Sequence, residues 1–247
     1  MENLKNLTTI SRELALAGLQ IGAIKINPDK PFLWASGTYN PIYNDNRMFL
    51  YYPELRKLII NGFILLINEI QATNANYIPD IIAGTSTAGI PHGYGLAQEL
   101  NLPFIYIRDE PKKHGMKNQI EGIDSDKHLN GDNVLLIEDL ISTGGSSVKA
   151  VQAIRNANGS IDSCFSIFNY DLWQAKSMFK GEIAFNKSTG EKLTKICNVF
   201  SLIHYSNILQ LGIEHKYINK QKENLLNEWI EDQENWGDKN GFPRVQK

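Results

Sequence analysis

The stretch that decides the fold is residues 134–146, VLLIEDLISTGGS, in a chain of 247 residues. Four apolar residues predict a buried strand, and two carboxylates, Glu138 and Asp139, end it. Residues 142–146 then bring hydroxyls and two adjacent glycines to the start of a helical pattern. Glycine lets the backbone turn tightly and approach a ligand, and the free N–H groups at the start of a helix attract an anion. The stretch therefore predicts a strand, a phosphate-binding loop and a helix in succession.

The two carboxylates narrow the kind of phosphate that this loop would hold. The loop lacks the Gly-Lys-Ser/Thr of a Walker loop and the GxGxxG of a dinucleotide site. A ribose 5-phosphate fits, because its hydroxyls can donate hydrogen bonds to Glu138 and Asp139 while its phosphate lies in the loop. Carboxylates also stabilise positive charge that develops on a ribose ring. The alternative is a plain strand–turn–helix whose hydroxyls cap the helix and whose acidic pair is solvated.

Apolar runs on both sides of this stretch predict the rest of a sheet. The runs cover residues 80–84, 104–107, 134–137 and 161–168. Helical patterns separate them at residues 90–100 and 146–157. Buried strands that alternate with helices indicate an α/β fold whose parallel sheet is covered on both faces.

The two ends of the chain predict helices around short strands. Near the start, five apolar residues recur at helical spacing: Leu4, Leu7, Ile10, Leu14 and Ala17. Residues 32–34 and 42–43 predict short strands, and Pro53 can open a helix because proline is tolerated in the first turn. Near the other end, residues 221–236 predict a closing helix, and we expect residues 238–247 to fray.

Charge and composition exclude several classes of protein. Lysine and arginine number 25 against 27 aspartates and glutamates, so the net charge of −2 offers no basic surface for nucleic acid. The most apolar stretch, residues 58–70, is shorter than the roughly 20 residues of a membrane span. The start of the chain lacks a secretory signal, and two cysteines are too few for a disulfide framework. We therefore expect a cytoplasmic protein that binds neither nucleic acid nor membrane.

A basic segment follows the apolar run at residues 104–107. It covers residues 108–122, RDEPKKHGMKNQIEG, and its basic side chains are Arg108, Lys112, Lys113, His114 and Lys117. Its glycines allow motion, so the segment can close over an anionic leaving group and exclude water. The alternative is a solvated surface loop.

These motifs together resemble a known family. Residues 134–146 resemble the ribosyl-pyrophosphate signature of the type I phosphoribosyltransferases, which implies 5-phosphoribosyl 1-pyrophosphate as a ligand and Mg²⁺ as a cofactor. PKKHG followed by NQIEG is similar to the catalytic loop of orotate phosphoribosyltransferases, homodimers in which this loop reaches into the partner's active site. Residues 32–47 and 84–93 are similar to that family's N-terminal hood and to the loop after its first sheet strand.

The resemblance implies a type I phosphoribosyltransferase fold, in which a central, mainly parallel sheet is flanked by helices and carries a small hood. Residues 1–52 would form the N-terminal helix and hood, and residues 53–247 the core with its closing helix, in one compact domain. The implied substrates are orotate and 5-phosphoribosyl 1-pyrophosphate. The implied products are orotidine 5′-phosphate and pyrophosphate, in the de novo synthesis of UMP.

The matching positions imply roles for individual residues. Lys112, His114 and Asp139 are implied as catalytic. The implied contacts of 5-phosphoribosyl 1-pyrophosphate are Arg108, Lys112, His114, Glu138, Asp139, Ser142, Thr143, Gly144, Gly145 and Ser146. Ser142 and Arg47 are implied for orotate. Mg²⁺ would have no direct protein ligand, because substrate oxygens and water would hold it.

Two positions depart from the family's pattern. Tyr39 stands where many relatives carry the lysine of a Lys-Ser-Pro sequence, and Asp109 stands where many have Lys or Ser. Two functions other than transfer to orotate are the alternatives. One is a phosphoribosyltransferase for a purine or another base, which the hood and the basic loop disfavour. The other is a non-catalytic regulator that senses 5-phosphoribosyl 1-pyrophosphate, and such a protein would keep residues 134–146 and lose the basic loop.

Overall fold

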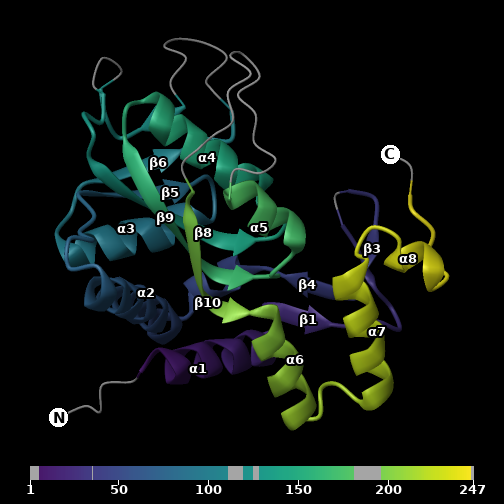
Figure 1. Ribbon diagram of the computed structural model, residues 1–247. Helices are drawn as coiled ribbons and strands as arrows, with labels where there is room; N and C mark the ends of the chain where they lie inside the picture. Colours follow the sequence, from purple (N-terminus) through teal and green to yellow (C-terminus); the bar gives the residue numbers. More distant parts are fainter. Residues whose placement is uncertain (1–5, 35, 111–118, 125–127, 181–195, 246–247) are drawn as a thin grey trace.

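The computed structural model describes residues 6–34, 36–110, 119–124, 128–180 and 196–245. A six-stranded sheet lies between two layers of helices, and a small hood and the C-terminal helices extend beyond one end of the sheet (Figure 1). Within the described ranges, no helix combines the length and the apolar character needed to cross a membrane.

The sheet has the strand order β10-β9-β8-β5-β6-β7, and its neighbours run parallel except for β6 and β7. Its strands are β5 (Ile81–Thr85), β6 (Phe104–Ile107), β7 (Ile120–Glu121), β8 (Asn133–Ile141), β9 (Ser160–Asn169) and β10 (Asn198–His204). The predicted α/β fold and its four predicted strands are therefore confirmed, whereas β7 and β10 were not predicted. β8 lies inside the sheet between β5 and β9, and its residues pack into a hydrophobic core on each face, so its sequence is apolar on both.

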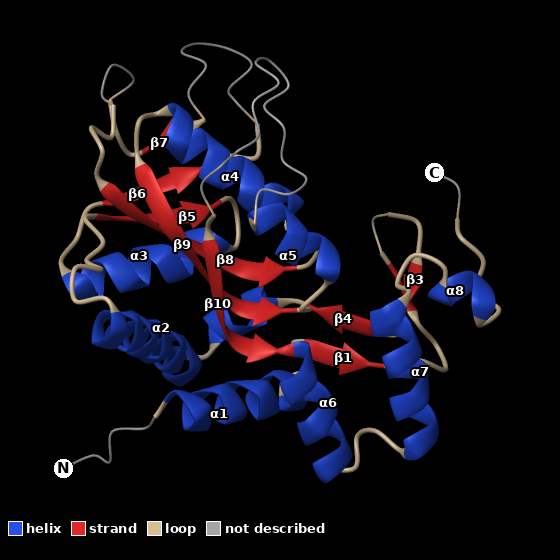
Figure 2. Ribbon diagram, in the orientation of Figure 1, coloured by secondary structure: helices blue, strands red, loops and turns tan. Residues whose placement is uncertain are grey.

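Two layers of helices cover the sheet (Figure 2). One face carries α1 (Leu7–Gln20), α2 (Pro53–Thr73) and α3 (Gly89–Leu100), and the other carries α4 (Gly145–Asn156) and α5 (Trp173–Phe179). Alternate residues of β8 supply both cores, since Leu135 and Ile137 pack toward α1 to α3 and Leu136 packs toward α4 and α5. The predicted helices are confirmed, and α2 begins at Pro53 as expected.

The hydrophobic core on the α1 side runs across the predicted boundary at residue 52. Leu14 of α1, Phe63 of α2, Phe165 of β9 and Leu202 of β10 all belong to it. The N-terminal helix and the sheet therefore share one set of buried side chains.

The hood consists of two short antiparallel strand pairs that precede α2. They are β1 (Ile24–Ile26) with β4 (Ile42–Asn44), and β2 (Phe32–Leu33) with β3 (Tyr39–Asn40). The strands expected at residues 32–34 and 42–43 are confirmed as β2 and β4. A 3-10 helix, η1 (Asn46–Tyr51), then leads into α2. Asn46 is buried, and its Nδ2 donates a hydrogen bond to the main-chain oxygen of Asp139 at 2.6 Å, which ties the hood to β8.

Three helices complete the described chain: α6 (Tyr205–Glu214), α7 (Lys220–Glu231) and α8 (Trp236–Lys239). The predicted closing helix is confirmed as α7. The expectation that residues 238–247 fray is wrong for residues 238–245. The ring of Phe242 stacks on Trp236, and the N–H of Val245 donates a hydrogen bond to the main-chain oxygen of Gly37 at 2.9 Å. The segment is held by the hood, which lies near the N-terminal end of the same chain.

Candidate active site

The acidic pair lies within β8, close to its carboxyl end. Glu138 is in register with Ser166 of β9, and the pairing continues to Ile141, opposite Asn169. The strand therefore delivers two carboxylates and the following loop to the carboxyl edge of the sheet. Ligands of parallel α/β sheets bind at this edge.

Glu138 is buried and fully engaged by its neighbours. Only 6% of the residue is exposed, and its carboxylate accepts hydrogen bonds from Thr85 Oγ1 at 2.6 Å and from Ser147 Oγ at 2.8 Å. Burial, reinforced by the charge of Asp139, holds the pKa of Glu138 well above the usual range of a carboxyl group. The alternative of a solvated acidic pair is therefore wrong for Glu138.

Asp139 is less enclosed than Glu138 and lies beside the hood. Its main-chain oxygen accepts the hydrogen bond from Asn46. Burial raises the pKa of its carboxyl, while a hydrogen bond with Glu138 and the charge of Arg47 act in the opposite direction. A partly buried carboxylate with a raised pKa at a strand end is well placed to bind a cationic or hydroxyl-bearing group.

The loop after β8 has the geometry expected of an anion site. Gly144 adopts a left-handed backbone with φ of 84°, and a Cβ there would lie 3.2 Å from the Cα of Ala175. The helix α4 begins at Gly145, so its first free N–H groups directly follow the loop. The side chains of Thr143 and Ser146 are exposed. The predicted strand, glycine loop and helix are confirmed, and their affinity for phosphate stays a prediction.

The predicted basic residues are described only in part. Arg108 follows β6, and its Nη1 lies 3.7 Å from Glu121 Oε1 of β7. It stands at the same edge of the sheet as β8's carboxylates, because β6, β5 and β8 run parallel. Four further predicted cations lie outside the described residues: Lys112, Lys113, His114 and Lys117.

Arg47 is the second residue implied for orotate. It lies on η1, its Nε is 2.7 Å from Asp45 Oδ1, and its side chain is 63% exposed. Its charge reaches Asp139, whose pKa it lowers, but Arg47 does not line the cavity described next. Its assignment to orotate gains no support from its position.

A cavity of about 590 Å³ opens beside the phosphate loop. The core contributes Leu140, Ser142, Thr143, Tyr170, Leu172 and Gln174. The hood contributes Leu33, Trp34, Ser36, Thr38, Asn40, Tyr43 and Asn44. The C-terminal segment contributes Gln233, Glu234 and Arg244. The cavity therefore lies between three parts of the chain, and Ser142 is the predicted orotate residue that lines it.

Sequence reasoning missed most of this lining. Tyr39 stands between two lining residues, Thr38 and Asn40, and its ring packs against Phe242 of the C-terminal segment. Tyr170 and Trp34 form part of the wall and contact each other, with ring centroids 5.5 Å apart. Aromatic residues in short strands and after β9 were visible in the sequence, but no local pattern showed that they converge.

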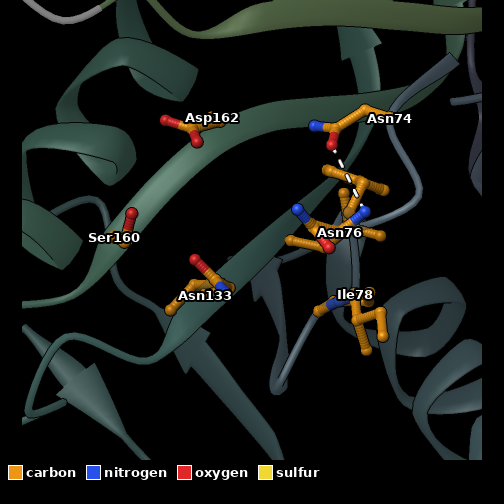
Figure 3. A pocket seen from close by; sticks show the side chains of 10 residues that line it. Asn74, Asn76, Ile78, Asn133, Ser160 and Asp162 are labelled. Atoms are coloured by element: carbon orange, nitrogen blue, oxygen red, sulfur yellow. Dashed lines mark hydrogen bonds between the residues drawn. The ribbon is translucent and has the colours of Figure 1, made fainter. Parts of the chain in front are cut away.

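A much smaller hollow of about 70 Å³ lies at the opposite end of the sheet (Figure 3). It is lined by residues at the starts of β8 and β9, Asn133 and Ser160, and by the segment after α2. There Asn74 Oδ1 accepts a hydrogen bond from the N–H of Asn76 at 3.3 Å. This hollow is separate from the acidic pair.

Comparison with known proteins defines the class. The family described as "Phosphoribosyl transferase domain" matches residues 55–194, which include β8, the glycine loop and α4. The fold is shared with orotate phosphoribosyltransferase from Aeropyrum pernix, with a TM-score of 0.61, 21% identity and coverage of 83% of this chain and 99% of that one. UMP synthase of Leishmania donovani gives a TM-score of 0.64 at 27% identity, covering 90% of this chain and 42% of that one. The fold and the loop are those of a type I phosphoribosyltransferase.

Curated relatives narrow the class further. Orotate phosphoribosyltransferase of Streptococcus pneumoniae serotype 19F (strain G54) is 42% identical over 228 residues, covering 92% of this chain and 98% of the relative. That of Streptococcus gordonii (strain Challis) is 43% identical over 230 residues, covering 92% and 99%. The chain belongs to the orotate phosphoribosyltransferases. It converts orotate and 5-phosphoribosyl 1-pyrophosphate to orotidine 5′-phosphate and pyrophosphate, in de novo pyrimidine synthesis. These relatives support neither transfer to another base nor a non-catalytic regulator.

Proposed function

We propose that the transfer takes place at the carboxyl edge of the sheet, with the 5-phosphate in the loop at residues 142–146 and orotate in the adjacent cavity. One observation carries this arrangement. Ser142 and Thr143 belong to the phosphate loop and also line the cavity. One short segment is therefore positioned to contact both the phosphate and the base, with Asp139 three residues before it.

In the proposed reaction, the bond between the anomeric carbon and the pyrophosphate oxygen breaks, and its electron pair leaves with pyrophosphate. A ring nitrogen of orotate forms the new bond to the same carbon, without a covalent enzyme intermediate, and its N–H proton is released to water or to the departing pyrophosphate. Positive charge develops on the ribose ring, and the carboxylate of Asp139 stabilises it while accepting hydrogen bonds from the ribose hydroxyls. Glu138, held by Thr85 and Ser147, fixes the adjacent main chain and with it the position of Asp139.

The leaving group needs positive charge, and the basic segment is its proposed source. Arg108 stands at the same edge of the sheet as Asp139. Lys112 and His114 are assigned to pyrophosphate from the family resemblance, and one of them would act as the general acid. These three basic groups would neutralise the negative charge that departs with pyrophosphate.

Mg²⁺ is the proposed cofactor. Carboxylate oxygens such as those of Glu138 and Asp139 are ligands that this ion accepts, but it keeps much of its shell from water and substrate phosphates. In the described part of the chain, no three His, Cys, Asp or Glu side chains come together as a metal site. In this proposal, substrate oxygens and water would supply most ligands, and the ion would neutralise charge on the pyrophosphate.

The proposed assembly is a cytoplasmic homodimer whose basic loops complete the partner's active site. It rests on the family resemblance of the loop at residues 108–122. The net charge of −2 supports the further proposal that nucleic acid is not a partner.

Ultraviolet absorbance of orotate tests the scheme with purified protein. We expect loss of orotate to require 5-phosphoribosyl 1-pyrophosphate and Mg²⁺, and a chelator to stop it reversibly. Asp139→Asn should lower kcat by about 10²–10³-fold, because a preorganised charge at the reacting centre is removed. Its unfolding temperature should stay near that of the wild type. A kcat close to the wild-type value would remove Asp139 from the proposed role.

Mixing two inactive variants tests the shared site. Asp139→Asn lacks the carboxylate and Lys112→Ala lacks the loop cation, so each homodimer should be inactive. If the loop acts on the partner, mixed dimers contain one intact site, and exchange of subunits should restore about a quarter of wild-type activity. Activity that stays absent after exchange, verified by a tag on one variant, would show that each loop serves its own subunit.

A further inference from the structure

Asn44 belongs to the wall of the cavity, and both polar atoms of its side chain are buried there without a partner among the described residues. It ends β4, and only 8% of it is exposed. Asn40, also in the lining, has hydrogen bonds at both polar atoms, as buried amides usually do. Its Oδ1 accepts a hydrogen bond from Trp229 Nε1 at 2.7 Å, and its Nδ2 donates one to the main-chain oxygen of Thr38. A buried amide with both atoms unpaired is costly unless a ligand satisfies it.

Arg244 presents a cation to the same cavity. It is the only Lys or Arg among the described residues that line it. Its Nη2 donates a hydrogen bond to the main-chain oxygen of Ser36 at 3.3 Å, and within the described chain no carboxylate forms an ion pair with it. Glu234 also lines the cavity as an exposed side chain, and among the described lining residues it is the one carboxylate that would oppose an anion there.

The backbone around Arg244 is held in place. The N–H of Arg244 donates to Asp238 Oδ1 at 2.9 Å, and the N–H of Val245 donates to the oxygen of Gly37 at 2.9 Å. Gly37 has φ of 83°, and a Cβ there would lie 2.4 Å from the Val245 oxygen, so the two segments are in close contact. These hydrogen bonds and the close packing of the hood against the C-terminal segment therefore hold Arg244 at the cavity.

We propose that Arg244 binds the carboxylate of orotate and that Asn44 pairs with the amide edge of its ring. Orotate carries a negative carboxylate, and a guanidinium matches a carboxylate through two parallel hydrogen bonds. Its pyrimidine ring also carries adjacent N–H and C=O groups, and an asparagine amide offers an acceptor and a donor to match them. Arg244 takes the role that the sequence assigned to Arg47, whose guanidinium is engaged by Asp45 outside the cavity.

Two ligands that differ only in the carboxylate separate these contacts. Orotidine 5′-phosphate carries it and uridine 5′-phosphate does not, while both keep the phosphate and the ribose. Titration calorimetry on the full-length protein gives both dissociation constants for each variant. Wild type should bind orotidine 5′-phosphate about 10- to 100-fold more tightly, as expected for a charge-assisted pair.

Arg244→Gln should remove this preference by weakening only orotidine 5′-phosphate, and Arg244→Lys should restore part of it because the charge returns. Asn44→Leu should weaken both ligands by a similar factor and leave their ratio intact. Asn44→Asp, which is nearly isosteric, repeats the test if the leucine variant does not fold. Lys239→Gln is the matched control, because Lys239 lies on the same segment, pairs with Asp232 and does not line the cavity.

Three results would overturn the proposal. The first is equal affinity of the wild type for the two nucleotides. The second is a preference that survives in Arg244→Gln but disappears in Arg47→Gln. The third is an Asn44 variant that folds and binds both ligands as the wild type does.

Discussion

The phosphate loop and the wall of the cavity are built in opposite ways. The loop is one continuous segment, in which β8, residues 142–144 and α4 follow each other directly. The wall joins segments from the two ends of the chain, as the hydrogen bond between Trp229 and Asn40 shows, because 189 positions separate these residues. The part of the site proposed to bind the phosphate is formed by residues close together in the sequence. The part proposed to surround the base is formed by residues that only tertiary packing brings together.

The two regions are also stabilised by different kinds of interaction. In the loop, the interactions are hydrogen bonds and backbone geometry, as between Glu138 and Ser147. The wall is backed by aromatic rings, and the buried Trp229 lies behind it in contact with Trp34, Tyr170 and Tyr205. Substitutions in the wall should therefore cost most in folding, and substitutions in the loop should cost less.

The largest expected effect is that of Trp229→Ala. The side chain is fully buried, and its removal leaves a cavity and an unpaired Asn40 oxygen. The free energy of unfolding should fall by about 3–5 kcal/mol, measured by urea denaturation. Trp173→Ala is the matched control, because Trp173 is 62% exposed and its loss should cost less than about 0.5 kcal/mol. Similar losses in the two variants would contradict a wall held by Trp229.

An intermediate effect is expected at Gly144 in the loop. Alanine there must adopt a left-handed backbone and crowd Ala175, so Gly144→Ala should lower the free energy of unfolding by about 1–2 kcal/mol. Gly145→Ala is the comparison, because position 145 has an ordinary φ and no atom within 4 Å of the added Cβ. It should leave stability unchanged or slightly raised. Equal losses at both positions would show that the loop's geometry is not the cause.

The smallest effect is expected at Glu138, and it depends on pH. Burial raises its pKa in the folded state, so the folded protein keeps a proton that the unfolded chain has already lost. Stability should therefore fall as pH rises above the usual carboxyl pKa toward the raised one. Glu138→Gln keeps the hydrogen bond from Thr85 without the charge, and it should be more stable than the wild type by about 1 kcal/mol at pH 8.

Unfolding curves from pH 5 to pH 8 measure this difference. The wild type should lose stability over this range, and Glu138→Gln should lose less. Glu99→Gln is the control, because Glu99 is an exposed carboxyl on α3 and its removal should leave the slope of the wild type unchanged. A parallel slope in Glu138→Gln would mean that burial does not raise the pKa of Glu138.

The sequence predicted the local part of the molecule well. Strands β5, β6, β8 and β9 and the helices between them follow from apolar periodicity, and the start of α4 follows from the paired glycines. The predictions failed where order comes from distant partners. Residues 238–245 have no strong local signal, yet Gly37 and Tyr39 hold them. The assignment of Arg47 to orotate stays a prediction, and no pattern in the sequence indicated its ion pair with Asp45.

The hydrogen bond between Asn40 and Trp229 has a consequence for synthesis of the chain. A ribosome adds about 5–20 residues per second, so the 189 positions between them take roughly 10–40 s. During that time β5, β6, β8 and β9 emerge and can pair, while the apolar inner surface of the hood has no cover. The hood is completed last, and nascent chains released before residue 229 would expose it to solvent and to one another.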